Sequence, residues 1–203
     1  MNVDEQIERL IGLGLHDRAG TTEDRFRELA GSMKDTDDAL VVIHPSVVPA
    51  SNLADLLVRE GKPGFVVEDM TDIDEFVPIE GLDIPDAPLY LVRNVRRGDE
   101  MRNWSPVEAL ESMTASGRTP LTVNEGISWL LQQPELLEPN HCFMCIGSRK
   151  PKNNGLDSRT PALWISGGTG RDGRERRGAP KLGWCWANNR HSWLGFASAA
   201  ERI

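Results

Sequence analysis

The sequence predicts an α+β protein in which several capped helices pack on an antiparallel sheet near the C-terminus. Two patterns predict this fold: helix-start signals before residue 140, and short apolar runs separated by Gly- and Pro-rich loops after it. The 39% hydrophobic and 27% charged content is typical of a folded chain, and 203 residues can bury a substantial core. We expect a single domain (1–203), with a helical hairpin (1–36), a mixed α/β part (37–140) and an antiparallel β part (141–203).

The spacing of apolar residues predicts that the first part is helical. Val3, Ile7 and Leu10 recur at intervals of three or four residues, which places them on one helix face. Thr21 or Thr22 can cap a second helix by accepting a hydrogen bond from its first turn. We expect the two helices to pack as a hairpin on the rest of the chain.

The segment after residue 38 contains two apolar runs with a helix between them. Residues 39–43 and 64–67 are rich in β-branched residues and predict buried strands, and Ser51 can cap the intervening helix. A strand, a helix and a strand within about 30 residues predict a small βαβ unit. Because no Gly-x-Gly-x-x-Gly opens the helix, we expect no dinucleotide, and the sequence indicates no other cofactor.

Two capping boxes predict the next helices. Ser105 with Glu108 and Thr122 with Glu125 have the Ser/Thr-x-x-Glu spacing that satisfies backbone N–H groups at a helix start. The second helix has a continuous apolar stripe, and Trp129 lies off that stripe, so we expect Trp129 at the rim of its packing.

The C-terminal part predicts four strands, at residues 141–146, 161–165, 182–187 and 191–196, arranged most simply as an antiparallel meander. The last two would form a hairpin with a two-residue turn at residues 188–189, because Asn tolerates positive φ. That register pairs Trp186 with His191 and Trp184 with Trp193, next to Arg190. The face that carries Trp184, Trp186, His191, Trp193 and Arg190 has two interpretations. Because tryptophans are usually well buried, a core face covered by a helix comes first; the functional hypothesis is that these residues form a ligand-binding face.

Two cysteine-based sites are further candidates. Cys185 and His191 have the chemistry of a nucleophile and its base, but only an odd-numbered hairpin loop would bring them together. Cys142, Cys145, Cys185 and His191, with His141, contain enough ligands for zinc. Because strand geometry would turn Cys142 and Cys145 to opposite faces, we expect buried thiols and no metal.

The acidic segment 68–75 is the last candidate. Its carboxylates, including Asp69 and Asp72, could hold a hard cation or serve a catalytic role, but the spacing matches no EF-hand. A solvated loop stabilised by Asx-turns accounts for it better.

Charge and cysteine content indicate the partners and the compartment. The net charge of −8 disfavours nucleic acid, although the chain carries +7 after residue 140 and −15 before it, so a protein or an anionic ligand is possible. The N-terminus has no secretory signal, and no apolar run could span a membrane. With three cysteines, an odd number, we expect reduced thiols in a cytoplasm.

From residue 64 to residue 200 the chain resembles an uncharacterised actinobacterial protein family, a domain of unknown function. The strings that carry the resemblance are VEDMTD (67–72), GDEM (98–101), NWSP (103–106), GRTPLT (117–122), NHCF (140–143), PALWIS (161–166) and PKLGWCW (180–186). The resemblance implies no activity, cofactor or site. The loops 150–157 and 169–177 look longer than the family pattern, so a family-wide function would not depend on their basic residues.

These patterns predict a cytoplasmic, non-catalytic binding or interaction protein that uses a Trp/His/Arg surface of its C-terminal sheet. The alternative is a small hydrolase or transferase that uses Cys185 with His191, or the carboxylates around Asp69 and Asp72.

Overall fold

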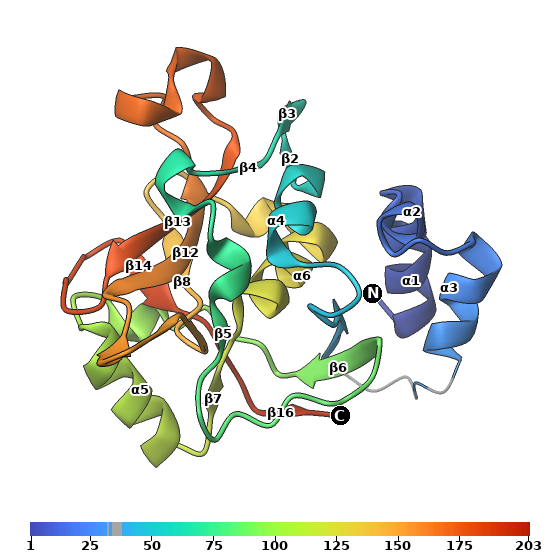
Figure 1. The fold of residues 1–203 in the computed structure, drawn as a ribbon, viewed down its shortest axis with the longest axis horizontal. Coiled ribbons are helices and arrows are strands. Elements are labelled where there is room, and N and C mark those ends of the chain that lie inside the picture. The colour runs from blue at the N-terminus through green and yellow to red at the C-terminus, as the bar shows by residue number, and fades with distance from the viewer. Residues whose placement is uncertain (32, 34–37) are drawn as a thin grey trace.

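The computed structural model describes residues 1–31, 33 and 38–203, and it has the predicted α+β fold (Figure 1). The α-helices are α1 (Val3–Gly12), α2 (Leu15–Arg18), α3 (Glu23–Ala30), α4 (Ala50–Leu53), α5 (Pro106–Ala115) and α6 (Val123–Gln132). Short 3-10 helices are η1 (Ala54–Leu56), η2 (Glu68–Met70), η3 (Ile73–Glu75), η4 (Asp99–Met101), η5 (Pro134–Leu136), η6 (Gly170–Asp172) and η7 (Arg174–Arg176). The expected boundary between parts 1–36 and 37–140 lies outside the described residues.

The strands form two main sheets and several two-stranded ones. A three-stranded sheet has the order β1-β6-β16, from β1 (Ala39–Ile43), β6 (Leu89–Arg93) and β16 (Glu201–Arg202). A five-stranded sheet has the order β14-β8-β12-β13-β4, from β14 (Leu194–Phe196), β8 (Cys142–Met144), β12 (Arg159–Ile165), β13 (Pro180–Trp186) and β4 (Phe65–Val66). The short pairs are β2 (Val58–Arg59) with β3 (Lys62–Pro63), β5 (Val77–Pro78) with β9 (Ser148–Arg149), β7 (Thr119–Pro120) with β15 (Ser198–Ala199), and β10 (Pro151–Lys152) with β11 (Gly155–Leu156).

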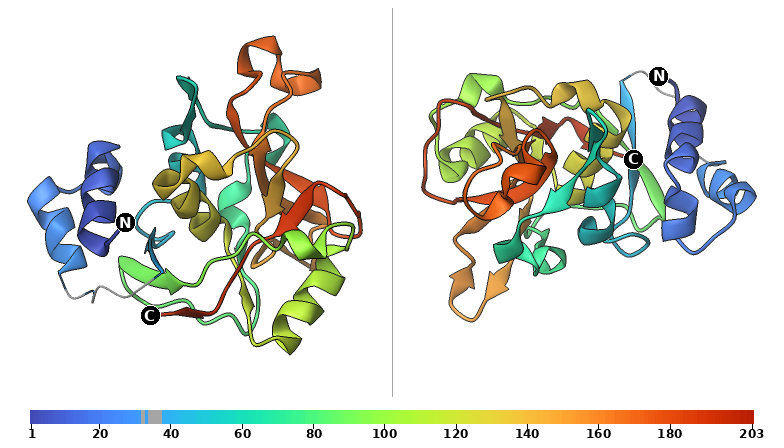
Figure 2. Two further views of the ribbon diagram at one scale, coloured as in Figure 1. Left: turned by 180° about the vertical axis from the view of Figure 1, so that it is seen from behind. Right: turned by 90° about the horizontal axis from the view of Figure 1, so that it is seen from above.

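Helix α6 lies at the centre of the fold, between the two main sheets (Figures 1 and 2). All ten of its residues are buried. Ile127 belongs to the same hydrophobic cluster as Val42 of the small sheet and Phe143 and Leu163 of the large one. The other face of the large sheet packs on α5, where Met113 shares a second cluster with residues of β8 and β14. The two helices with predicted capping boxes therefore cover opposite faces of the large sheet.

Local signals placed the starts of α3, α5 and α6 correctly, but the predicted cap at Ser51 is wrong, since Ser51 lies inside α4 and Pro49 is the N-cap. The boxes Ser105–Glu108 and Thr122–Glu125 cap α5 and α6 as predicted, and Thr22 caps α3. The N-terminal hairpin of α1 and α3 is present, with the short helix α2 between them. No helix in the described ranges has the length and apolar character that a membrane crossing requires.

The predicted βαβ unit is wrong, because its two strands belong to different sheets. β1 pairs antiparallel with β6, so that Val41 lies opposite Leu91, whereas β4 pairs in parallel with β13. The intervening helix is only one turn of α-helix (α4) followed by η1. The chain then forms β2 and β3 before β4 pairs with the edge of β13. The apolar runs were real strands, but their partners are distant in sequence.

The predicted hairpin of the last two strands is also wrong. β13 pairs along its whole length with β12, where Trp186 lies opposite Arg159, and β4 pairs with the other edge of β13 at residues 181–182. β14 begins only at Leu194 and pairs in parallel with β8, at the far edge of the sheet. Residues 187–193 therefore form a connection between distant strands, and the sheet is mixed instead of an antiparallel meander.

Candidate functional site

The connection 187–193 and the end of β13 carry exposed aromatic side chains. Trp186 is 47% exposed and Trp193 is 36% exposed. Trp104 and Val107, on a neighbouring segment, are 37% and 51% exposed. Among the described residues, these four are nearly half of the nine large apolar side chains that are exposed. Exposed apolar groups gathered in this way are typical of an interaction surface.

Hydrogen bonds fix the connection to the segment before α5. The backbone N–H of Asn103 donates to the carbonyl oxygen of His191 at 2.9 Å. The guanidinium of Arg190 donates to the carbonyl oxygen of Asn103 at 3.2 Å and pairs with Glu108 at 2.5 Å. The side chains of Trp104, Trp186, Arg190, His191 and Trp193 are called here the aromatic surface.

The residues of the predicted binding face form two separate ring pairs. The rings of Trp184 and Trp186 lie 4.4 Å apart, and those of His191 and Trp193 lie 4.8 Å apart. Trp184 is half-buried, and its indole N–H donates to Asp69 at 3.1 Å. Because β13 and β14 are not neighbours, Trp184 and Trp193 are not cross-strand partners.

His141 lies beside this surface in a cluster of charged residues. Its Nε2 is 2.9 Å from Asp99 and 2.6 Å from a guanidinium nitrogen of Arg102, and its Nδ1 is 3.1 Å from Glu138. Since both ring nitrogens contact side chains of the protein, neither is free to bind a metal or to accept a proton from a substrate. The cluster therefore orders the loops beside the aromatic surface.

The cysteines do not come together as a metal site. Cys142 and Cys145 lie in different hydrophobic clusters, on opposite faces of the large sheet, as strand geometry predicts. Burial raises the pKa of Cys142 to about 12 and that of Cys185 to about 11. No group of three or more His, Cys, Asp or Glu side chains in the described part of the chain is arranged to hold a metal ion.

Cys185 and His191 are likewise not joined. Cys185 packs against the second hydrophobic cluster, whereas the ring of His191 lies on Trp193. No hydrogen bond connects the Cys185 thiol to His191 within the described residues. A thiol with a raised pKa and no adjacent base is a poor nucleophile at neutral pH.

The acidic segment is neutralised by cations from the C-terminal half. Asp72 accepts hydrogen bonds from Arg159 at 2.6 Å and from Lys150 at 2.7 Å. Asp69 accepts one from Arg171 at 2.9 Å. Arg159, and then Lys150, lower the pKa of Asp72 to about 2. The basic loops therefore serve to bind the acidic segment, which explains much of the charge asymmetry of the chain.

These ion pairs make stability depend on pH. The pKa of Asp72 is lower in the folded state than its ordinary value of 3.8. The ionised carboxylate therefore stabilises the folded state fully above about pH 4, and this stabilisation is lost between about pH 4 and pH 2. We expect Asp72→Asn to reduce the free energy of unfolding by about 2 kcal/mol at pH 7 and by much less at pH 2. Urea unfolding of both proteins at the two pH values measures this difference, and an equal loss at both would contradict it.

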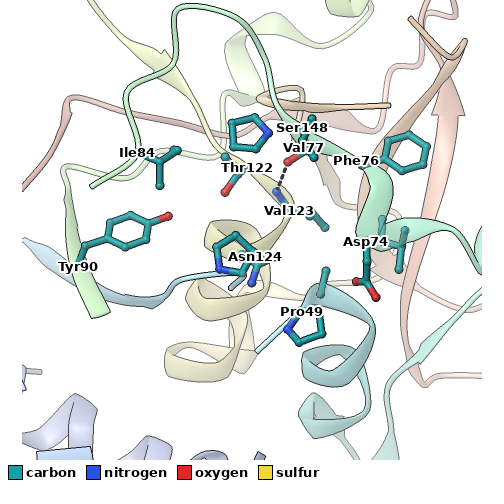
Figure 3. Close-up of a pocket in the computed structure, with 14 residues that line it drawn as sticks. Pro49, Asp74, Phe76, Val77, Ile84, Tyr90, Thr122, Val123, Asn124 and Ser148 are labelled. Carbon is teal, nitrogen blue, oxygen red and sulfur yellow. Dashed lines mark hydrogen bonds between the residues drawn. The ribbon is translucent and has the colours of Figure 1, made fainter. Parts of the chain in front are cut away.

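Sequence reasoning missed a cavity at the N-terminal end of α6 (Figure 3). Its volume is about 80 Å³, and its walls include Pro49, Phe76 and Ile84. The polar groups in the wall are already bonded: the phenol of Tyr90 donates to Glu125 at 3.0 Å, and Ser148 Oγ accepts from the backbone N–H of Val123 at 3.0 Å. A cavity so far below the usual 300 Å³ of a ligand pocket suits a few water molecules or a small side chain. Its walls come from segments that are distant in sequence, so no sequence motif predicts this cavity.

Comparison with known proteins places the chain in a family. No curated protein and no solved structure is similar to the chain. A family model described as a family of unknown function (DUF5701) matches residues 9–203. The match is longer than the resemblance seen in the strings from residue 64 onward, because it includes the N-terminal helices. Because this match covers nearly the whole chain, the chain belongs to the DUF5701 family of unknown function.

Proposed function

We propose that this protein is a non-catalytic binding protein that holds a partner on the aromatic surface. The observation that carries the proposal is the exposure of Trp104, Trp186 and Trp193. Tryptophan side chains are usually well buried, and they are enriched at the centres of protein interfaces. Covering these side chains with a partner would remove a large apolar area from water.

The partner that fits this surface is an acidic peptide segment of another protein. Arg190 is half-exposed and already pairs with Glu108, so a carboxylate of the partner would share its guanidinium with Glu108 while an apolar residue of the partner packs on Trp193. Arg190 is the basic residue of the aromatic surface, and its charge favours an acidic segment over a basic one. Trp184 supports the surface from behind through its contact with Trp186.

The contacts favour this function over the hydrolase or transferase alternative. That alternative needs Cys185 beside His191, or free carboxylates at Asp69 and Asp72. The thiol packs in a hydrophobic cluster, and both carboxylates are engaged by arginine or lysine.

We also propose that the protein works in the cytoplasm, and that it has the actinobacterial origin that the family resemblance implies. Cys142, Cys145 and Cys185 are free thiols, which supports a reducing compartment. The packing of α1 against β1 and α6 supports one domain.

Selection of peptides against the intact chain tests the binding function. We expect a random peptide library to yield sequences that combine Asp or Glu with an apolar residue. Because interface tryptophans often contribute about 2 kcal/mol or more, Trp193→Ala and Trp186→Ala should each weaken binding of a selected peptide by roughly 10-fold or more.

The control is Ile203→Ala, which removes an exposed apolar side chain next to Leu91 of β6, in the other main sheet. It should leave the affinity of the peptide unchanged. Failure to select any peptide, or equal loss of affinity in all three variants, would contradict the proposal.

A further inference from the structure

A second cavity lies at the opposite end of α6. Its volume is about 450 Å³, within the usual range for small-molecule sites. Its walls are Gln6 of α1, the beginning of β1, the loop 94–96 after β6, and the last turn of α6. Unlike the small cavity at the N-terminal end of α6, it has mostly polar walls.

Two polar groups of α6 in this wall have no partner. The Nε2 of Gln132 donates to the carbonyl oxygen of Gln6 at 3.2 Å, but its Oε1 is buried without a hydrogen bond. The indole N–H of Trp129 also has no acceptor in the described part of the chain, but this group is not buried. Both residues are in the wall of the cavity, three positions apart on α6. The wall thus holds one buried acceptor without a partner, Gln132 Oε1, which costs free energy, and one accessible donor.

A cationic group stands at the same cavity. The Nε of Arg96 donates to Oδ1 of Asn94 at 3.2 Å, and its two terminal nitrogens have no acceptor among the described residues. Arg118 donates to the carbonyl oxygen of Asn94 at 2.8 Å. Burial lowers the pKa of Arg118, and the nearby positive charge of Arg96 lowers it further. Asn94 itself has a φ of +52°, a left-handed conformation that costs energy in a non-glycine residue. The loop therefore holds two arginines close together beside the cavity, and no carboxylate in the described ranges pairs with either.

The cavity also has an anionic group. Asp38 is in its wall, and its carboxylate has no ion-pair partner among the described residues. The free groups are thus of both signs: Arg96 and the Trp129 N–H can bind an anion, while Asp38 and Gln132 Oε1 can accept from a cationic donor.

We propose that this cavity is a binding site for a free α-amino acid. The carboxylate of the ligand would accept hydrogen bonds from Arg96 and from the indole N–H of Trp129. Its ammonium group would donate to Gln132 Oε1 and face Asp38. An α-amino acid carries both groups on one carbon, which matches a cavity whose wall holds free groups of both signs. The site is separate from the aromatic surface, so it adds a small-molecule ligand to the proposed protein partner.

Saturation-transfer NMR with the intact chain tests this site, using the twenty standard amino acids at about 5 mM each, followed by calorimetry of the best binder. We expect at least one to bind, and sodium acetate or methylammonium chloride at the same concentration to bind far more weakly. Removing one charge-assisted hydrogen bond should weaken binding roughly 10- to 100-fold, so we expect this loss in Arg96→Met, and a smaller loss in Trp129→Phe and Gln132→Met.

The matched control is Arg174→Met, which removes an exposed arginine from η7, far from this wall. It should bind as the wild type does. Arg96 is exposed, so Arg96→Met should fold normally even if Gln132→Met does not, and the melting temperature of each variant checks this point. No binding by any of the twenty amino acids, binding of acetate as tight as that of the amino acid, or full affinity in Arg96→Met would overturn the proposal.

Discussion

Replacing Arg202 with Met is expected to lower the free energy of unfolding by about 3–5 kcal/mol. Arg202 makes a two-pronged ion pair with Glu125: its Nε donates to Oε1 at 2.6 Å, and one terminal nitrogen donates to Oε2 at 2.8 Å. Glu125 is 0% exposed, and the side chain of Arg202 is 4% exposed. Without the guanidinium, the carboxylate would be buried at the start of α6 with only the Tyr90 phenol and the Thr122 N–H as donors. An uncompensated buried charge of this kind is strongly destabilising.

Urea unfolding at neutral pH measures this loss of stability. Two further variants show whether it comes from the unpaired buried charge. Arg18→Met breaks an exposed pair with Asp55, 2.8 Å long, and should cost less than about 1 kcal/mol. The double variant Glu125→Leu/Arg202→Met should be more stable than Arg202→Met alone, because it removes the stranded charge. If Arg202→Met costs no more than Arg18→Met, the buried pair does not hold β16 to α6 as the geometry indicates.

Interactions between near neighbours could be predicted from the sequence. A capping box joins residues three apart, so the starts of α5 at Ser105 and of α6 at Thr122 follow from local chemistry. Side-chain alternation in a strand is equally local: Cys142 and Cys145 do lie on opposite faces, and Cys185 faces away from Trp184.

Strand partners could not be predicted, because they depend on which edges are free in three dimensions. The sequence around Asn188 and Asn189 suits a tight turn, but β12 occupies one edge of β13 along its whole length, and β4 occupies the other edge at residues 181–182. Leu194–Phe196 instead pairs with β8, about fifty residues earlier in the chain. The predicted aromatic face therefore separated into two ring pairs, and Trp104, which the sequence did not single out, joined the surface.

No sequence motif predicts either cavity, since each is built from segments that meet only in the folded chain. One sequence signal pointed toward the larger one. Trp129 lies off the apolar stripe of its helix, and it is in the wall of that cavity. The predicted rim placement is wrong, however, because Trp129 is 7% exposed and belongs to the main hydrophobic cluster, where its ring lies 5.4 Å from that of Phe143.

Replacing Gly126 with Ala is expected to destabilise the protein by about 2–3 kcal/mol, although alanine is the better helix former by about 1 kcal/mol. A Cβ at this position would lie 2.3 Å from the sulfur of Cys145 and 3.1 Å from Leu163. Both residues are fully buried on the face of the large sheet that packs on α6. The missing side chain lets the helix approach the sheet closely, and an added methyl would push the two apart.

The matched control is Gly12→Ala, at the end of α1, where an added Cβ meets no atom within 4 Å. That variant should be as stable as the wild type or more stable by up to about 1 kcal/mol, so thermal and urea unfolding of the two alanine variants separate close packing from helix propensity. Cys145→Ala in the Gly126→Ala background removes the sulfur that the methyl meets and should restore part of the loss. If Gly126→Ala is as stable as Gly12→Ala, Cys145 can move aside, and the approach of α6 to the sheet is set by its other contacts.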